Sequence, residues 1–269
     1  MENIYNVKEL ADKVLGSLRD NASNMSTGFE SVDRLTRGLL PGQLYIVGAR
    51  PAMGKTAFVL NIIKHLILDE KKKVVLFSPG LHREKLMERL LAVTAQVGIK
   101  YNTDDYTDIE WRKLENAAKD IGDSKLIIDD SPQLSGDVIL HELRKDKLRN
   151  TDIIFIDNVH LLQDDNRQEL FVRLKAFAVK MNIPIVTTLD IESCVDNRSS
   201  HRPVLPDIIE YGNIAEIADV VMFLYRDEYY DADTDRRGIA EIRIEKNING
   251  KTGVAELVYI NEFARFADI

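Results

Sequence analysis

The chain has 269 residues, of which 36 are Lys or Arg and 44 are Asp or Glu, so its formal net charge is −8. Apolar residues make up 45% of it, which is enough to bury a sizeable core and excludes an intrinsically disordered chain. The acidic balance argues against non-specific wrapping of nucleic acid, because such binding depends on Lys and Arg side chains that neutralise phosphates. We expect one domain with a short N-terminal appendage.

The cysteine content, the first residues and the length of the apolar runs indicate where in the cell the protein is located. A single cysteine, Cys194, excludes an intramolecular disulfide. The first residues lack the basic and apolar regions of a secretory signal peptide, and the longest apolar run, residues 220–225, is far shorter than the roughly 18 residues that span a bilayer. These features predict a cytoplasmic protein that does not enter a membrane.

Apolar residues recur with helical spacing from Val7 to Leu18, which predicts a short amphipathic helix. A helix of this length is only marginally stable alone in water, so it must dock on another surface. The following polar residues, 20–26, have the composition of a linker, which leaves either this domain or a neighbouring copy as the docking partner. We therefore divide the chain into a linker-like helix with its linker, residues 1–25, and a main domain, residues 26–269.

Short β-rich runs alternate with helical patterns from residue 43 onward. Continuous apolar runs are typical of strands buried on both faces, so they predict an α/β fold with a mostly parallel central sheet flanked by helices. The last three runs lack long helices between them, which predicts antiparallel C-terminal strands, and the polar segment 191–206 is expected to be a mobile loop. The predicted strands are residues 44–47, 74–78, 126–129, 153–157, 185–188, 220–226, 239–246 and 254–260, and the predicted helices are residues 56–68, 84–97, 109–121, 138–148 and 170–181.

The most specific motif is the segment GARPAMGKT at residues 48–56, between a predicted strand and a predicted helix. It matches the phosphate-loop pattern G-x-x-x-x-G-K-[ST] at Gly54, Lys55 and Thr56, with one extra residue after Gly48. In this pattern the loop amides and the helix dipole favour phosphate, the lysine reaches the outer phosphates, and the threonine hydroxyl is a Mg²⁺ ligand. The sequence therefore predicts a site for ATP or ADP with Mg²⁺. The predicted nucleotide-binding residues are Gly48, Ala49, Arg50, Pro51, Ala52, Met53, Gly54, Lys55, Thr56 and Ala57.

An apolar strand that ends in an acid, residues 153–157, has the pattern of a Walker B motif. Alone this pattern is weak evidence, because many buried strands end in aspartate. Together with the phosphate loop, it makes Asp157 the expected second residue of a Mg²⁺ site, beside Thr56.

Further distinctive segments are STGFESVD at residues 26–33, GL at 38–39, ARP at 49–51, MGKT at 53–56, LKA at 174–176, NIP at 182–184, MFLYRDE at 222–228, GIAEI at 238–242 and RF at 265–266. Together they resemble the C-terminal, RecA-like P-loop motor domain of the DnaB family of replicative DNA helicases. The preceding helix is similar to the family's linker helix, which docks on the adjacent subunit of a ring. The resemblance implies an ATPase that forms a hexamer on single-stranded DNA, unwinds DNA and works with replication proteins. We expect the family's N-terminal domain to be absent.

Several working parts of that family are replaced in this chain. The resemblance puts a catalytic glutamate, which polarises the attacking water, at the position of Gly80, and a neighbour-supplied arginine finger at the position of Ile248. Lys246 is retained as a candidate trans-acting residue, and the glutamine that senses the γ-phosphate falls on Asp190. A general base contributes about 10² to 10⁴ in rate and an arginine finger about 10³ to 10⁵. We therefore expect slow or absent hydrolysis, with Lys55 left to stabilise the phosphates.

The family's DNA-facing loop corresponds to residues 207–212, where Ile209 replaces an arginine that contacts DNA phosphates, so binding of single-stranded DNA is expected to be weakened. Two functions remain open. One is a nucleotide-binding module with impaired hydrolysis that acts as a regulator, loader or decoy subunit in replication or mobile-element biology. The other is an active ATP-dependent helicase motor. The residues favour the first, and they leave open both a monomer and a homo-oligomer up to a hexamer.

Overall fold

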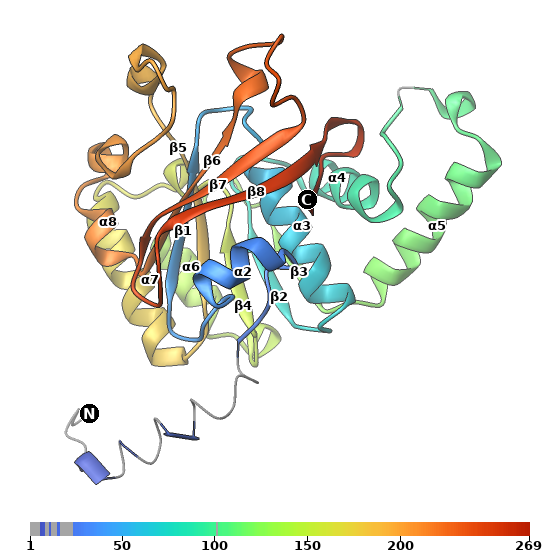
Figure 1. The fold of residues 1–269 in the computed structure, drawn as a ribbon. Coiled ribbons are helices and arrows are strands. Elements are labelled where there is room, and N and C mark those ends of the chain that lie inside the picture. Colours follow the sequence, from blue (N-terminus) through green and yellow to red (C-terminus); the bar gives the residue numbers. More distant parts are fainter. Residues whose placement is uncertain (1–5, 9–10, 12–14, 17–23, 101) are drawn as a thin grey trace.

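The structure is a computed structural model that describes residues 6–8, 11, 15–16, 24–100 and 102–269. The predicted N-terminal helix and its linker lie largely outside the described residues, so their docking partner stays a prediction. In the described part of the chain one sheet of nine strands forms the centre of the molecule, in the order β3-β2-β4-β5-β1-β6-β7-β8-β9 (Figure 1). The strands are β1 (Leu44–Ala49), β2 (Val74–Phe77), β3 (Leu126–Asp129), β4 (Ile153–Ile156), β5 (Ile185–Asp190), β6 (Val220–Arg226), β7 (Ile239–Asn247), β8 (Gly253–Ile260) and β9 (Arg265–Asp268).

The direction of the strands divides the sheet into two parts. The six strands from β3 to β6 in the spatial order pair in parallel, and β7, β8 and β9 continue the sheet as antiparallel strands. The predicted α/β class and the antiparallel C-terminal extension are both confirmed. None of the described helices is long and apolar enough to cross a membrane.

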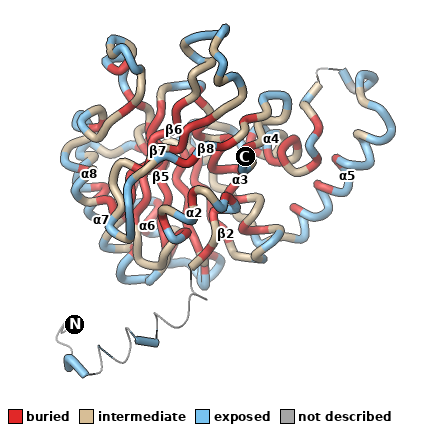
Figure 2. The backbone as a smooth tube through the Cα atoms, viewed as in Figure 1, coloured by how far each residue is buried: buried red, intermediate tan, exposed pale blue. Residues whose placement is uncertain are grey.

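Helices cover both faces of the sheet, and the alternation of side chains along β1 explains the two layers. Tyr45 and Val47 belong to one buried cluster with residues of α2, α3 and α4, whereas Leu44 and Ile46 belong to a second cluster with residues of α6, α7 and α8. Figure 2 shows the buried strands between these partly exposed helices. The helices are α2 (Glu30–Thr36), α3 (Lys55–Leu68), α4 (Arg83–Ala95), α5 (Asp108–Gly122), α6 (Gly136–Glu142), α7 (Arg167–Met181) and α8 (Ile214–Ile217).

Two predicted helices end earlier in the structure, and three elements were not predicted. The helix predicted at residues 138–148 is α6, which ends at Glu142, and a separate 3₁₀ turn follows at Asp146–Leu148. The helix predicted at residues 84–97 ends at Ala95, because Gln96 takes a left-handed conformation with φ of 53°. Strand β9 and the short helices α2 and α8 were not predicted.

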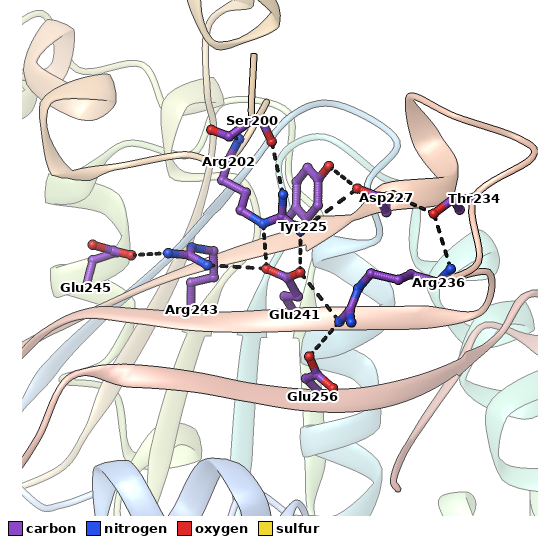
Figure 3. A network of polar contacts seen from close by, with 10 residues as sticks. All are labelled: Ser200, Arg202, Tyr225, Asp227, Thr234, Arg236, Glu241, Arg243, Glu245 and Glu256. Carbon is purple, nitrogen blue, oxygen red and sulfur yellow. Dashed lines mark hydrogen bonds and ion pairs between the residues drawn. The ribbon is translucent and has the colours of Figure 1, made fainter. Parts of the chain in front are cut away.

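The segment 191–206, predicted as a mobile loop, contains a 3₁₀ turn (Ser193–Asn197) and is anchored by arginine pairs. Arg198 pairs with Asp207 at 2.9 Å. Arg202 donates to both carboxylate oxygens of Glu241 on β7, at 2.9 and 2.6 Å, and its guanidinium lies 4.4 Å from the centre of the Tyr225 ring. Figure 3 shows that Arg202, Arg236 and Arg243 all point toward Glu241. The loop is therefore fastened to the sheet extension.

We expect Glu241→Ala to lower the free energy of unfolding by about 1–3 kcal/mol, because it leaves partly buried arginines without their acceptor. The Glu241 side chain is 8% exposed and accepts from both Arg202 and Arg243. Burial opposes its ionisation, but the bonds from Arg202 and Arg243 outweigh burial and lower the pKa of Glu241. The stabilisation is thus present at neutral pH and is lost as the pH falls through that lowered pKa. Urea unfolding at pH 7 measures the change.

Glu256→Ala is the matched control for this variant. Glu256 lies on the neighbouring strand β8, its side chain is 46% exposed, and it pairs with Arg236 at 2.5 Å. Exposed pairs contribute about 0–1 kcal/mol, so the control should lose little. Equal losses in the two variants would contradict a special role for Glu241.

Candidate nucleotide-binding site

The phosphate loop, residues 48–56, connects β1 to the first turn of α3 at the centre of the sheet, where β1 lies between β5 and β6 (Figure 1). Two glycines fix its shape. Gly54 has φ of 113°, a conformation that other residues rarely adopt. A Cβ atom at Gly48 would lie 2.8 Å from the Phe223 ring, which leaves no room for a side chain. The loop backbone is therefore held close to the start of α3, as the motif predicts.

The ammonium of Lys55 is enclosed by acceptors of its own chain. Its Nζ donates to the carbonyl oxygens of Ala49 and Arg50, both at 3.1 Å, and lies 2.5 Å from Asp190 Oδ1 at the end of β5. Burial opposes the ionisation of Asp190, but hydrogen bonds from His160 and Lys55 outweigh burial and lower the pKa of Asp190 to about 2. The Lys55 ammonium is thus already paired with the Asp190 carboxylate within the same chain.

The two predicted Mg²⁺ ligands lie side by side. Thr56 Oγ1 donates to Asp157 Oδ2 at 2.7 Å, and Thr188 Oγ1 donates to the other oxygen of Asp157 at 2.6 Å. Asp157 is 1% exposed, and burial raises its pKa despite these two hydrogen bonds. Hydroxyl and carboxylate oxygens are the donors that Mg²⁺ prefers. The donor set therefore fits a Mg²⁺ ion held between Thr56 and Asp157.

A cleft of about 520 Å³ opens above these residues, a size within the usual range of small-molecule sites. The sequence did not indicate that Arg89 of α4 and residues after β8 would line it, because no motif links them to the loop. Arg89 also acts electrostatically on Asp157, where it favours the ionised carboxylate. The lining residues are Pro51, Ala52, Gly54, Lys55, Thr56, Ala57, Arg89, Asn158, Asp190, Tyr259, Asn261 and Ala264.

The other predicted loop residues have different surroundings. Gly48, Ala49 and Met53 are buried and do not line the cleft. The guanidinium of Arg50 pairs with Asp196 at 2.8 Å and donates to a carbonyl of the 191–206 segment, and Arg50 does not line the cleft. The ten predicted residues therefore form the loop together, but only six of them line the cleft.

Gly80, at the position of the family's catalytic glutamate, has no carboxylate, and a side chain there would have to displace the end of the Leu161 side chain. A Cβ atom at Gly80 would lie 2.4 Å from Leu161 Cδ1 and 3.7 Å from Asn158 Nδ2. The Leu161 side chain, which is 46% exposed, thus fills the space that a side chain at position 80 would enter. A carboxylate could be installed there only if Leu161 moved.

The stretch that carries the family's finger has a different role within this chain. Lys246 Nζ donates to the carbonyl oxygens of Ala215, Glu216 and Ala218, at 2.9, 2.9 and 2.6 Å, at the end of α8. Burial lowers the pKa of Lys246. Ile248 is 60% exposed and has no group that could stabilise a phosphate. Lys246 therefore caps a helix of its own chain here, and its trans-acting role stays a prediction.

The segment that corresponds to the DNA-facing loop is a 3₁₀ helix, Leu205–Tyr211, in which Ile209 is 71% exposed. The Tyr211 hydroxyl donates to the backbone carbonyl of Asp190 at 2.8 Å. This bond connects the segment to the end of β5, beside Lys55. The nucleotide cleft and the candidate DNA-facing segment are therefore joined through one residue.

The carboxyl group of Glu210 in this segment supports a prediction about pH. Burial and the neighbouring Glu192 carboxyl raise the pKa of Glu210 to about 7. A carboxyl group with a raised pKa costs stability as the pH rises above its unfolded value, and the cost is complete above the folded value. Glu210→Gln should therefore be more stable than the parent at pH 8, by less than about 1 kcal/mol because the residue is exposed, with the smallest difference near pH 4. Thermal unfolding at pH 4, 6 and 8 measures this, and a variant less stable at pH 8 would contradict it.

The sheet order and the strand–loop–helix unit of β1 and α3 define a RecA-like ATPase fold. The chain belongs to the family described as the DnaB-like helicase C terminal domain, whose model matches residues 24–268. This confirms the family that the sequence resembles.

Curated relatives are replicative helicases. The chain is 34% identical over 266 residues to the replicative DNA helicase DnaC of Bacillus subtilis (strain 168), which covers 95% of this chain and 59% of that protein. It is 33% identical over 258 residues to the replicative DNA helicase DnaB of Geobacillus stearothermophilus, which covers 92% and 57%. The chain thus spans about three-fifths of the length of these relatives.

Solved structures have the same fold. A structure described as an ATPase domain matches with a TM-score of 0.92 at 28% identity, over 99% of this chain and 100% of that one. A DnaB-like replicative helicase, described together with its interactions with primase, matches with a TM-score of 0.88 at 28% identity, over 100% of this chain and 68% of that one.

Proposed function

We propose that this chain binds ATP or ADP with Mg²⁺ at residues 48–57 and hydrolyses ATP slowly or not at all. The observation that supports this proposal is the convergence of Lys55, Thr56 and Asp157 at one cleft, while Gly80 and Ile248 offer neither a carboxylate nor a guanidinium. The residues that grip a nucleotide are therefore present without those that speed its cleavage.

Binding would depend on the loop and its two flanking elements. The backbone amides before α3 face the phosphates, and the Lys55 ammonium provides a point charge for the outer ones. Thr56 would hold Mg²⁺ directly and Asp157 would hold it through water, as in other phosphate-loop sites. The bound ion would neutralise phosphate charge. Each of these roles uses an atom that already lies at the cleft or just beneath it.

Hydrolysis needs a group that accepts a proton from the attacking water near neutral pH. Among the residues that line the cleft, the single carboxylate is that of Asp190. Its pKa of about 2 makes it a poor proton acceptor, and Lys55 and His160 already engage both of its oxygens. We therefore assign turnover below about 10⁻² s⁻¹ to the isolated chain, against about 10 s⁻¹ for an ordinary enzyme.

Assembly and partners follow from the family. We propose a cytoplasmic role in DNA replication, with weak contact to single-stranded DNA at the segment that contains Ile209, and either a monomer or a homo-oligomer up to a hexamer. The alternative function is an active hexameric helicase motor on single-stranded DNA. The identity of 34% to a replicative helicase favours that alternative. It would require a neighbouring subunit to complete each site.

Two measurements on the intact chain separate these functions. Calorimetric titration with Mg·ADP and Mg·ATP tests binding, and phosphate release with and without single-stranded DNA tests turnover. We expect saturable binding with turnover below about 10⁻² s⁻¹ in both conditions. Turnover near 10 s⁻¹, together with a hexamer by light scattering when Mg·ATP is present, would favour the active motor.

A further inference from the structure

The phosphate-loop lysine has an anionic partner inside its own domain. Lys55 Nζ and Asp190 Oδ1 are 2.5 Å apart, and their side chains are 6% and 34% exposed. The other oxygen of Asp190 lies 3.3 Å from His160 Nε2. The carboxylate is therefore fixed by a hydrogen-bonding group at each of its oxygens.

The backbone of Asp190 is fixed as well. Asp190 pairs with Ala49 in the register of β5 and β1, and the next amide, that of Ile191, donates to the Ala49 carbonyl at 3.0 Å. The Asp190 carbonyl accepts from the Tyr211 hydroxyl at 2.8 Å. The strand pairing and the tyrosine therefore hold the backbone of Asp190 in place at the carboxyl end of β5.

The position of the Asp190 carboxylate beside Lys55 affects the binding of the outermost phosphate of a nucleotide. In a phosphate-loop site the loop amides cradle the inner phosphates and the lysine reaches toward the outer ones. A carboxylate beside that ammonium, in a half-buried cleft, repels an anion placed there far more than it would in water. Arg89 is the second cation of the lining, but none of the hydrogen bonds among the described residues joins it to Asp190. The carboxylate of Asp190 therefore lies in the cleft beside Lys55, the residue that reaches the outer phosphates in this type of site.

We infer that Asp190 makes this site selective for a nucleoside diphosphate over a nucleoside triphosphate. The inference rests on the proposed function, because it concerns the same site and presupposes that a nucleotide enters it. A diphosphate can use the loop amides and share Lys55 with Asp190. A triphosphate must displace the carboxylate from Lys55 or accept its repulsion. The chain would then bind a nucleoside diphosphate directly, without first hydrolysing a triphosphate.

The test compares Mg·ADP with the Mg²⁺ complex of a non-hydrolysable ATP analogue, by calorimetric titration of the full chain. We expect the parent to bind Mg·ADP at least about tenfold more tightly than the analogue. Asp190→Asn should strengthen binding of the analogue at least about tenfold, while its affinity for Mg·ADP changes less than about threefold. Glu192→Gln, which removes a charge two residues away without touching Lys55, should leave the preference unchanged. Asp190→Gln provides a second variant, and the rise in unfolding temperature on adding each nucleotide provides a second readout.

The outcomes separate the two proposals. Binding of Mg·ADP with the same preference in the parent and in both Asp190 variants would overturn the selectivity and leave the proposed function intact. Equal affinity of the parent for the two nucleotides would overturn it too. If neither nucleotide binds to the parent or to any folded variant, the proposed function fails and the inference fails with it. If Glu192→Gln lost the preference for Mg·ADP as fully as Asp190→Asn does, the preference would come from the overall negative charge near the site, and the role of Asp190 would be overturned.

Discussion

Lys55→Ala is expected to weaken the binding of Mg·ADP by on the order of 10²-fold. A hydrogen bond to a charged group contributes about 1.5–3 kcal/mol, and each 1.4 kcal/mol is tenfold in affinity. The substitution has a second effect in this chain, because it leaves the ionised Asp190 beside the phosphates without its cation. Both effects lower affinity. Calorimetric titration of the variant against the parent measures the change.

A control and a rescue separate these two effects. Lys64→Ala removes a lysine from the same helix, at a position that does not line the cleft, and should change affinity less than about twofold. Adding Asp190→Asn to Lys55→Ala removes the uncompensated carboxylate, so part of the lost affinity should return. Unchanged binding in Lys55→Ala, with the fold intact by circular dichroism, would mean that nucleotide binds elsewhere or not at all.

The parts of the fold that the sequence predicted are those with local signals. The central strands are continuous apolar runs, and the phosphate loop is a contiguous motif whose glycines are required by its own backbone, as at Gly54. Thr56 and Asp157 were expected to share a Mg²⁺ site because the phosphate loop occurs together with an apolar strand that ends in an acid, and the two side chains are hydrogen-bonded in the structure. These features needed no knowledge of distant contacts.

Strand β9 and helix α2 depend on contacts far along the chain, which explains why their sequences carried no signal. In β9 only Phe266 is buried, and its ring packs edge to face on Phe58 of α3. The first turn of α2 is capped by Asp268, whose carboxylate accepts from the backbone amides of Glu30 and Ser31. Seven residues would not form a stable helix alone, so α2 depends on the cap from β9 and on the packing of Val32 in the core.

The same limit applies to the site. The sequence identified Asp190 and Gly80 as departures from the family, but it could not say that Asp190 would pair with Lys55 or that Leu161 would cover Gly80. Arg89 was not singled out, because an exposed arginine on a helix carries no distinguishing pattern. The chemistry of single residues was thus predictable, whereas the contacts that decide their roles arise where separate strands and helices meet.

Restoring the missing catalytic groups should raise ATP hydrolysis, and most strongly when Leu161 is also removed. Gly80→Glu is compatible with the backbone, since Gly80 is not among the glycines with positive φ. Its Cβ would lie 2.4 Å from Leu161 Cδ1, the end of a side chain that is 46% exposed and must turn away, so Gly80→Glu alone should gain less than it does without the leucine. Combined with Leu161→Ala, it should increase phosphate release by on the order of 10²- to 10⁴-fold, the contribution of a general base. Leu161→Ala by itself is the control and should give no increase.

Ile248→Arg completes the design and tests assembly. The finger acts on the site of a neighbouring subunit, so adding Ile248→Arg to the double variant should raise turnover further only at protein concentrations where subunits associate. The side chain is 60% exposed, so an arginine there has room to extend. A concentration-independent gain would place the arginine in the site of its own chain. No gain in the folded triple variant would mean that position 80 does not face the attacking water, and the loss of activity would then need another cause.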